Sequence, residues 1–336
     1  MSVTSEPALD PSPTLAATAS PAPTTSITTT AAPAVLSERA VPRRHWVRWT
    51  ISAVVALLLV SLVTGIARNP NYQWELFWGY FTRPVVLQGL RLTLLVTLYA
   101  GVLGFVLGVV LALARLSGSG LVNAAAWFYI WFFRSLPLTV LLIIVFNASQ
   151  FFPTLALKLP LLPALFSTQT PLLLPALVAG VVALAMNEAA YAAELIRGGI
   201  LSVDAGQIEA ATALGLSPRR RLLRIVLPQA LRSIVPGYVN QLIGLVKMSS
   251  LVYYVGLADM FTAVYILESR TPNDIVPILL AGSAWYLVIA TVLSVAQYYI
   301  ERYYARGAVR TLPPTPWQRL RRSLSGARVR LAEVTR

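Results

Sequence analysis

Six long hydrophobic stretches, separated by shorter polar segments, dominate the sequence. They cover, within a few residues, about 49–67, 86–114, 124–150, 172–197, 234–264 and 277–300. A helix rises ~1.5 Å per residue, so each stretch is long enough to cross the roughly 30 Å hydrocarbon core of a bilayer. The pattern predicts an all-α integral membrane protein with about six transmembrane helices.

The N-terminal segments differ from these stretches in composition. Residues 1–45 consist largely of Ala, Pro, Thr and Ser, which are too poor in large apolar groups to form a core, so we expect a disordered tail. Residues 46–84 are expected to hold an additional first transmembrane helix and an aromatic outer segment in the headgroup region. A signal peptide cleaved near Gly65 is the alternative, although the long preceding tail argues against it.

The distribution of charge predicts the orientation. The chain has 27 Lys and Arg against 13 Asp and Glu, a net charge of +14. The basic residues lie beside the ends of the hydrophobic stretches, without the interleaved aromatics that stack on bases, so a nucleic-acid partner is not expected. The segments between spans on the side of the membrane opposite to the two termini hold only four basic residues, Arg68, Arg83, Lys158 and Arg270. The positive-inside rule therefore places both termini, including a basic tail at 303–336, in the cytoplasm.

A long cytoplasmic loop, residues 198–233, is predicted to fold as a helix, a turn and a helix. Glu209 near a helix start is favoured by the helix dipole, and Ala210 and Ala211 allow close approach of another backbone. Gly215 permits a left-handed turn, and a second helical run ends at Pro228. Such a compact surface suits docking to a protein. The alternative is an amphipathic helix whose arginines bind lipid headgroups.

The spacing of this loop resembles a known motif. Glu209-Ala210-Ala211, three residues, Gly215, nine residues and then Ile225-Val226-Leu227-Pro228 is similar to the EAA loop of permease subunits in ATP-binding-cassette importers. The likeness covers about residues 85–302. It includes Gly89-Leu90 with Thr93-Leu94, the Arg134-Ser135-Leu136-Pro137-Leu138 segment and Asn187-Glu188-Ala189-Ala190, which are similar to the polar-amino-acid branch of these permeases. One departure is Lys247-Met248-Ser249-Ser250-Leu251, where the branch usually has Lys-Asp-Thr-Ser-Leu.

The resemblance implies a function and a set of partners. Transport of a polar amino acid would be driven by a cytoplasmic ATPase dimer that carries ATP and Mg and docks on the loop. The coupling residues would be Glu209, Ala210, Ala211, Gly215 and Pro228. A second permease copy, or a related permease, would complete the pathway, and an extracytoplasmic binding protein would deliver the substrate. The only lysines, Lys158 and Lys247, do not follow Gly, so the chain has no Walker A phosphate loop and is expected to be neither an enzyme nor a cofactor carrier.

Polar residues within the hydrophobic stretches are candidates for the substrate pathway, because ionisable groups there are expensive unless paired or hydrated. The candidates are Asn187, Glu188, Asn240, Gln241, Lys247 and Arg134. Glu188 could receive the ammonium group of an amino acid, and Lys247 or Arg134 its carboxylate. The alternative is a permanent bridge from Glu188 to Lys247 or Arg134 that only fixes packing. Arg134 could also extend to the membrane surface.

Two further patterns concern helix packing. Gly101, Gly104 and Gly108 form a strip along which another helix can approach closely. Glu194 and Arg197 are three residues apart on one helical face, so we expect them to pair.

Composition limits the remaining function classes. The absence of Cys and the single His45 leave no thiolate or histidine cluster for a metal and no catalytic triad. A secondary transporter or channel, a membrane-anchored scaffold, and a permease for another small polar solute remain as alternatives. The sequence names neither the substrate nor the choice between a homodimer and a heterodimer of permeases.

Overall fold

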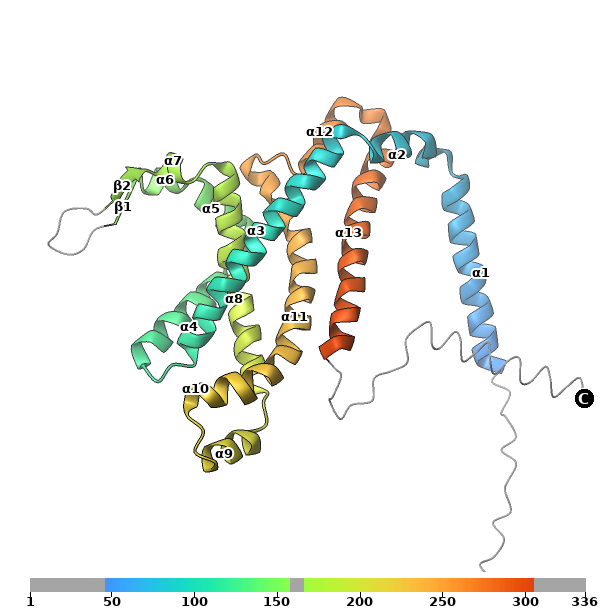
Figure 1. The fold of residues 1–336 in the computed structure, drawn as a ribbon. Helices are drawn as coiled ribbons and strands as arrows, with labels where there is room; N and C mark the ends of the chain where they lie inside the picture. Colours follow the sequence, from blue (N-terminus) through green and yellow to red (C-terminus); the bar gives the residue numbers. More distant parts are fainter. Residues whose placement is uncertain (1–45, 158–165, 305–336) are drawn as a thin grey trace, which may run out of the picture. The chain divides into compact units, whose positions relative to one another are not determined.

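The computed structural model describes residues 46–157 and 166–304, which are almost entirely helical (Figure 1). In chain order the elements are α1 (Trp46–Arg68), η1 (Pro70–Tyr72), α2 (Trp74–Phe81), α3 (Pro84–Arg115), α4 (Gly120–Ser135), α5 (Leu138–Phe146), α6 (Ala148–Phe151), β1 (Thr154–Leu157), β2 (Phe166–Gln169), α7 (Thr170–Leu173), α8 (Ala176–Leu201), α9 (Ala205–Ala213), α10 (Pro218–Arg221), η2 (Leu222–Val226), α11 (Leu227–Met248), η3 (Ser249–Val255), α12 (Met260–Arg270), η4 (Pro272–Asp274) and α13 (Ile275–Tyr304). The expected tail at 1–45 and nearly all of the expected tail at 303–336 lie outside the described residues.

The chain separates by its internal contacts into two units, Met1–Ser61 and Leu62–Arg336. The described part of the first unit is the greater part of α1. This helix is apolar on every side between its ends, which is typical of a helix surrounded by lipid. In the second unit, the predicted aromatic segment forms η1 and α2, with the side chain of Asn69 capping η1.

The centre of the second unit is the pair α3 and α8, whose close approach depends on glycine. A Cβ on Gly104 would lie 2.8 Å from the Cβ of Glu188, and one on Gly108 would lie 2.6 Å from the Cβ of Ala192. Both distances are too short for real contacts, so only glycine lets the two backbones pack at this spacing. The predicted glycine strip is confirmed.

One predicted span is broken by proline. The single helix expected over 124–150 is wrong, because α4 and α5 are separated at Leu136 and Pro137 and are bent by 104°. Pro137 has no N–H to donate, and its ring disfavours helical geometry at the residue before it. Leu136 is accordingly extended, with φ −77° and ψ 133°.

A second predicted span, 234–264, also bends. The continuous helix from α10 to η3 and the following α12 are inclined by 54°. The break follows Gly256, which has φ 73°, a left-handed conformation that glycine adopts readily. In the part of the chain that the structure describes, four helices are long and apolar enough to cross a membrane, or up to six if each bent pair is one span. The expectation of about six spans agrees with the larger number.

The segment predicted as a loop at 151–171 contains a small hairpin. Strands β1 and β2 pair antiparallel, with Thr154 opposite Gln169 and Leu157 opposite Phe166. The hydroxyl of Thr170, at the start of α7, donates a hydrogen bond to the Phe152 carbonyl oxygen and closes the base of this hairpin. The part of the chain that the structure describes is therefore helical with one short β-hairpin.

Candidate coupling loop and substrate site

The loop between α8 and α11 begins with a capped helix. Asp204 precedes α9, and its Oδ1 accepts a hydrogen bond from the Gln207 N–H at 3.2 Å. A carboxylate at this position satisfies one of the free N–H groups of the first turn. Short polar residues after α8 therefore start a new helix within a few residues.

Gly215 ends α9 in the left-handed conformation, with φ 70°. The Leu216 N–H donates to the Ala211 carbonyl at 3.1 Å, and the Gly215 N–H donates to the Thr212 carbonyl at 2.9 Å. These two bonds form a Schellman motif, which requires a residue that tolerates positive φ. The predicted left-handed turn at Gly215 is confirmed.

The second helix of the loop runs directly into α11. Pro218 begins α10, and the π-helical segment η2 connects it to the first turn of α11, which contains Pro228. The prediction that the second helical run ends at Pro228 is wrong. Pro228 lies in the first turn of α11, and the π-helical segment η2 directly before it accommodates the proline ring and its missing N–H within a continuous helical run. The helices α10 and α11 are thereby joined without an intervening loop.

The side chains of this loop differ widely in their exposure to solvent. Glu209 and Ala210 are exposed, whereas Ala211 is only 2% exposed and packs inside the loop. Leu214, which sequence reasoning did not single out, is 81% exposed immediately before the Gly215 turn. The sequence did contain a signal for this exposure, since Leu214 directly precedes Gly215. A residue that caps a helix at the tip of a helical hairpin points away from the rest of the chain.

Among the candidates for the substrate pathway, Asn187 and Glu188 lie in the buried face of α8. The Asn187 amide donates to the Phe133 carbonyl at 3.0 Å and is thereby fixed. Glu188 is 5% exposed, and its Oε1 has no hydrogen-bond partner among the described residues. A buried acceptor of this kind is expensive unless a donor reaches it.

Gln241 is the second candidate with an unused acceptor. It lies on α11, which packs against α8, and its Oε1 is buried without a hydrogen-bond partner in the described part of the chain. Tyr238, one turn earlier, donates its hydroxyl to the Gly101 carbonyl at 2.6 Å. The interior thus holds acceptors on both α8 and α11 that no described donor satisfies.

The remaining polar candidates, Arg134, Asn240 and Lys247, are exposed on the chain surface. The Arg134 guanidinium lies 5.1 Å from the centre of the Tyr191 ring, a cation–π arrangement. Within residues 46–157 and 166–304 the one salt bridge joins Arg197 to Glu194 at 2.8 Å, which confirms that predicted pair. The alternative of a permanent bridge from Glu188 to Arg134 or Lys247 is therefore not found there.

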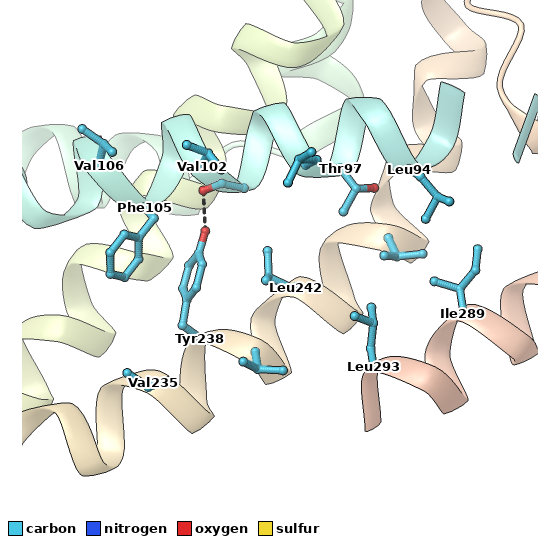
Figure 2. Close-up of a pocket in the computed structure, with 14 residues that line it drawn as sticks. Leu94, Thr97, Val102, Phe105, Val106, Val235, Tyr238, Leu242, Ile289 and Leu293 are labelled. Atoms are coloured by element: carbon cyan, nitrogen blue, oxygen red, sulfur yellow. Dashed lines mark hydrogen bonds between the residues drawn. The ribbon is translucent and has the colours of Figure 1, made fainter. Parts of the chain in front are cut away.

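A separate apolar cavity of about 450 Å³ lies between α3, α11 and α13 (Figure 2). Its two side chains with hydroxyl groups are already bonded, Thr97 to the Thr93 carbonyl and Tyr238 to the Gly101 carbonyl. None of the six pathway candidates lines this cavity. It can hold apolar groups, and it offers nothing to a charged solute.

The helical hairpin formed by α9 and α10, between the spans α8 and α11, is accompanied by a match to a known family of membrane proteins. Residues 104–306 match the model described as "Binding-protein-dependent transport system inner membrane component". The chain belongs to this family. It is therefore a multi-pass membrane protein, the permease subunit of an ATP-binding-cassette importer.

Two relatives of this inner membrane component are named for arginine. The arginine transport system permease protein ArgU of Corynebacterium glutamicum is 34% identical over 273 residues, which cover 81% of this chain and 85% of ArgU. The arginine transport system permease protein ArtQ of Bacillus subtilis is 36% identical over 206 residues, which cover 61% of this chain and 86% of ArtQ.

Two solved structures share the fold. A chain of the solved structure "Crystal structure of an amino acid ABC transporter with histidines" is 32% identical, with a TM-score of 0.57 over 66% of this chain and 94% of that one. A chain of the MetNI methionine ABC transporter, at 20% identity and a TM-score of 0.53, covers 66% of this chain and 96% of its own length, and it supports the fold alone.

Proposed function

We propose that this permease imports a polar amino acid and that the Glu188 carboxylate receives the ammonium group of the substrate. The observation that carries the proposal is the buried Glu188 Oε1, which no described residue satisfies. A charged ligand that donates hydrogen bonds would supply the missing partner and offset the desolvation of the carboxylate. The names of the relatives, which include arginine transport, favour a substrate with positive charge.

The carboxylate of the substrate needs a cation, and Lys247 is the better of the two candidates. Arg134 is engaged by the Tyr191 ring, whereas Lys247 lies exposed near the C-terminal end of α11. In a pathway between two permease subunits, such an exposed ammonium would face the substrate. The amide oxygen of Gln241 would orient the ligand by accepting a further hydrogen bond.

We infer that the loop formed by α9, Gly215 and α10 couples the permease to a cytoplasmic ATPase dimer that binds ATP and Mg. The proposal is supported by the exposed Glu209, Ala210 and Leu214 and by the positive charge that orients the loop to the cytoplasm. Closure of the ATPase would move α9 and α10 together, because Arg221 donates to the Thr212 hydroxyl at 2.6 Å. The helix α10 would then carry the motion into α11.

The proposed assembly contains a second permease copy or a related permease, together with an extracytoplasmic binding protein. One solved structure that shares the fold, a bacterial alginate ABC transporter, is in complex with a periplasmic protein that holds an alginate pentasaccharide. Membership of a binding-protein-dependent family argues against a secondary transporter, a channel or a passive scaffold. A permease for a different small polar solute remains the second candidate.

Reconstitution tests this proposal. The permease, its ATPase and its binding protein would be placed in liposomes, and ATP-dependent uptake would be measured for arginine, histidine, glutamine, glutamate and a non-amino-acid solute. We expect uptake of at least one amino acid that requires both ATP and the binding protein. Uptake without ATP, or uptake of only the non-amino-acid solute, would contradict the proposal.

A further inference from the structure

The apolar cavity between α3, α11 and α13 has no part in the proposed path of the substrate. Its volume of about 450 Å³ lies within the range of ~300–1,000 Å³ that is common for small-molecule sites. Three of its α3 side chains are more than half exposed, Leu98 at 58%, Val102 at 54% and Val106 at 57%. The cavity therefore opens along α3 to whatever surrounds the chain in the membrane.

The cavity is long in the direction of the helix axis. On α3 it extends from Leu94 to Val106, which lie at opposite ends in Figure 2, and these residues are ~18 Å apart along the helix at ~1.5 Å per residue. The hydrocarbon region of one leaflet is ~15 Å thick, half of the bilayer core. The length of the cavity therefore suits one acyl chain of a single leaflet.

A cation lies beyond one end of this cavity. A shallower groove of about 300 Å³ shares Leu94 and Leu98 with the cavity and is also lined by Arg91. Arg91, Leu94 and Leu98 are spaced by three and four residues, so they lie on one face of α3. Arg91 is ~10 Å along the helix from Pro84, where α3 begins. The face thus places a guanidinium near the membrane surface and an apolar cavity below it.

The cation has no protein partner of opposite charge. Arg91 is exposed, and the one salt bridge among the described residues joins Arg197 to Glu194. A guanidinium within a transmembrane span is expensive unless an anion or water reaches it. A phosphate group can accept two parallel hydrogen bonds from a guanidinium. A phospholipid carries its phosphate at the surface and its hydrocarbon below, in the same order as Arg91 and the cavity.

The charge of this face disfavours a second permease copy as the occupant. Helices α3 and α11 contain no Asp or Glu, and the one acidic residue of α13 is Glu301, in its last turn and far from the Pro84 end of α3. A second copy that packed through the same face would bring apolar side chains but no carboxylate to Arg91. A lipid phosphate complements the charge of this face better.

We propose that the cavity binds one acyl chain of a phospholipid whose phosphate pairs with Arg91. Inside the cavity the hydroxyl groups of Thr97 and Tyr238 are bonded to backbone carbonyls, so hydrocarbon meets no unused polar group there. With both termini in the cytoplasm, as the charge distribution predicts, the lipid belongs to the outer leaflet. This site is separate from the import of an amino acid and does not depend on the identity of the substrate.

Lipid binding to the complete transporter tests the proposal. The transporter would be washed free of co-purified lipid in detergent and titrated with dioleoyl phosphatidylglycerol, and native mass spectrometry would count the lipid bound to each permease. Dioleoylglycerol, which has the same chains without the phosphate, is the matched ligand. We expect a saturable site that binds phosphatidylglycerol roughly tenfold or more tightly than dioleoylglycerol, because only the former has an anion for Arg91.

Variants of the cation test the headgroup contact. Arg91→Gln should lower the affinity for phosphatidylglycerol by roughly tenfold or more and leave the affinity for dioleoylglycerol unchanged. Arg91→Lys keeps the charge and should retain most of the affinity. Arg83→Gln is the control, because Arg83 lies at the same end of α3 over the Tyr80 ring and lines neither the cavity nor the groove.

A second pair of variants tests the acyl-chain contact. Val102→Trp should fill the opening of the cavity and weaken the binding of both lipids. Val110→Trp is the control, because Val110 is 57% exposed on the same helix and does not line the cavity. Unfolding midpoints would show that each variant is folded. The Arg91 variants leave the volume of the cavity unchanged, so they test the site even if the tryptophan variant does not fold.

Each outcome supports or overturns the lipid site. Selective loss with Arg91→Gln and general loss with Val102→Trp, beside unchanged controls, support it. Equal binding of the two lipids, or unchanged phosphatidylglycerol binding by Arg91→Gln, overturns it. A cysteine introduced at Val106 that cross-links to another permease in native membranes would also overturn it, because protein would then cover the cavity. Loss of amino acid uptake with normal lipid binding would refute only the proposed substrate.

Discussion

Glu188 on α8 packs directly against Gly104 on α3, where a Cβ would lie 2.8 Å from both the Cβ and the Cγ of Glu188. Because Gly104 has no side chain, the Cβ and Cγ of Glu188 can pack against the backbone of α3. A buried carboxylate is thus placed by backbone packing, with one oxygen left free of described partners.

The first prediction concerns this contact. Gly104→Ala should force α3 and α8 apart and destabilise the permease by about 1–3 kcal/mol, the usual range for overpacking. Gly244→Ala is the matched control, because a Cβ there meets nothing within 4 Å. Thermal unfolding of the purified protein in detergent should show a lower midpoint only for Gly104→Ala. Equal midpoints for both variants would contradict this account of the α3–α8 contact.

The second prediction concerns the turn of the coupling loop. Gly215→Val should strain the left-handed conformation by roughly 1–2 kcal/mol and displace α10 relative to α9. Uptake and transport-coupled ATP hydrolysis should fall, while membrane insertion is retained. Gly215→Asn should be much milder, because asparagine tolerates positive φ. Normal coupled hydrolysis by the valine variant in liposomes would count against the assignment of the loop.

The third prediction concerns Leu214, which is 81% exposed at the tip of the loop. Burial of a leucine side chain in an interface contributes about 1.5–3 kcal/mol. Leu214→Ala should therefore weaken binding of the ATPase by roughly tenfold or more, without lowering the unfolding midpoint of the permease alone. Leu223→Ala, at a position that is 50% exposed on η2, is the control. Unaltered affinity of the Leu214 variant in a binding titration would show that the tip does not dock.

The fourth prediction concerns assembly. One chain supplies up to six spans, and we expect it to form half of a two-fold pathway together with a second permease. Cross-linking in native membranes should yield a permease dimer, either of identical chains or with a related chain. Only monomeric permease in the presence of the ATPase would exclude the proposed architecture.

Local patterns predicted much of the fold. The left-handed turn required only Gly215 and its neighbours, the Glu194–Arg197 pair required only helical spacing, and the close approach of α3 required only the glycine strip. The break at Pro137 also had a local signal. The break was missed because the continuous run of apolar residues at 124–150 was interpreted as one span although Pro137 lies within it.

The rest depends on how the helices are rotated and packed. The sequence predicted that Glu188 and Lys247 bind one substrate or form a bridge, but it could not show that Glu188 lies in the buried face of α8 and Lys247 is exposed near the end of α11. Which face of a helix meets which neighbour is set by tertiary contacts such as those of Gly104. The unsatisfied oxygens of Glu188 and Gln241 could likewise be recognised only with every neighbouring donor in place.

The central claim is that Glu188 binds the substrate, and the most direct measurement is ATP-dependent amino acid uptake by Glu188→Gln, with Glu194→Gln on the same helix as the control. Glutamine keeps the shape and removes the charge. The account predicts at least a tenfold loss of uptake for Glu188→Gln, with the yield of assembled transporter and its basal ATP hydrolysis unchanged, and near-normal uptake for Glu194→Gln. Normal uptake by Glu188→Gln, or a loss of uptake explained by a lower yield of folded complex, would contradict it.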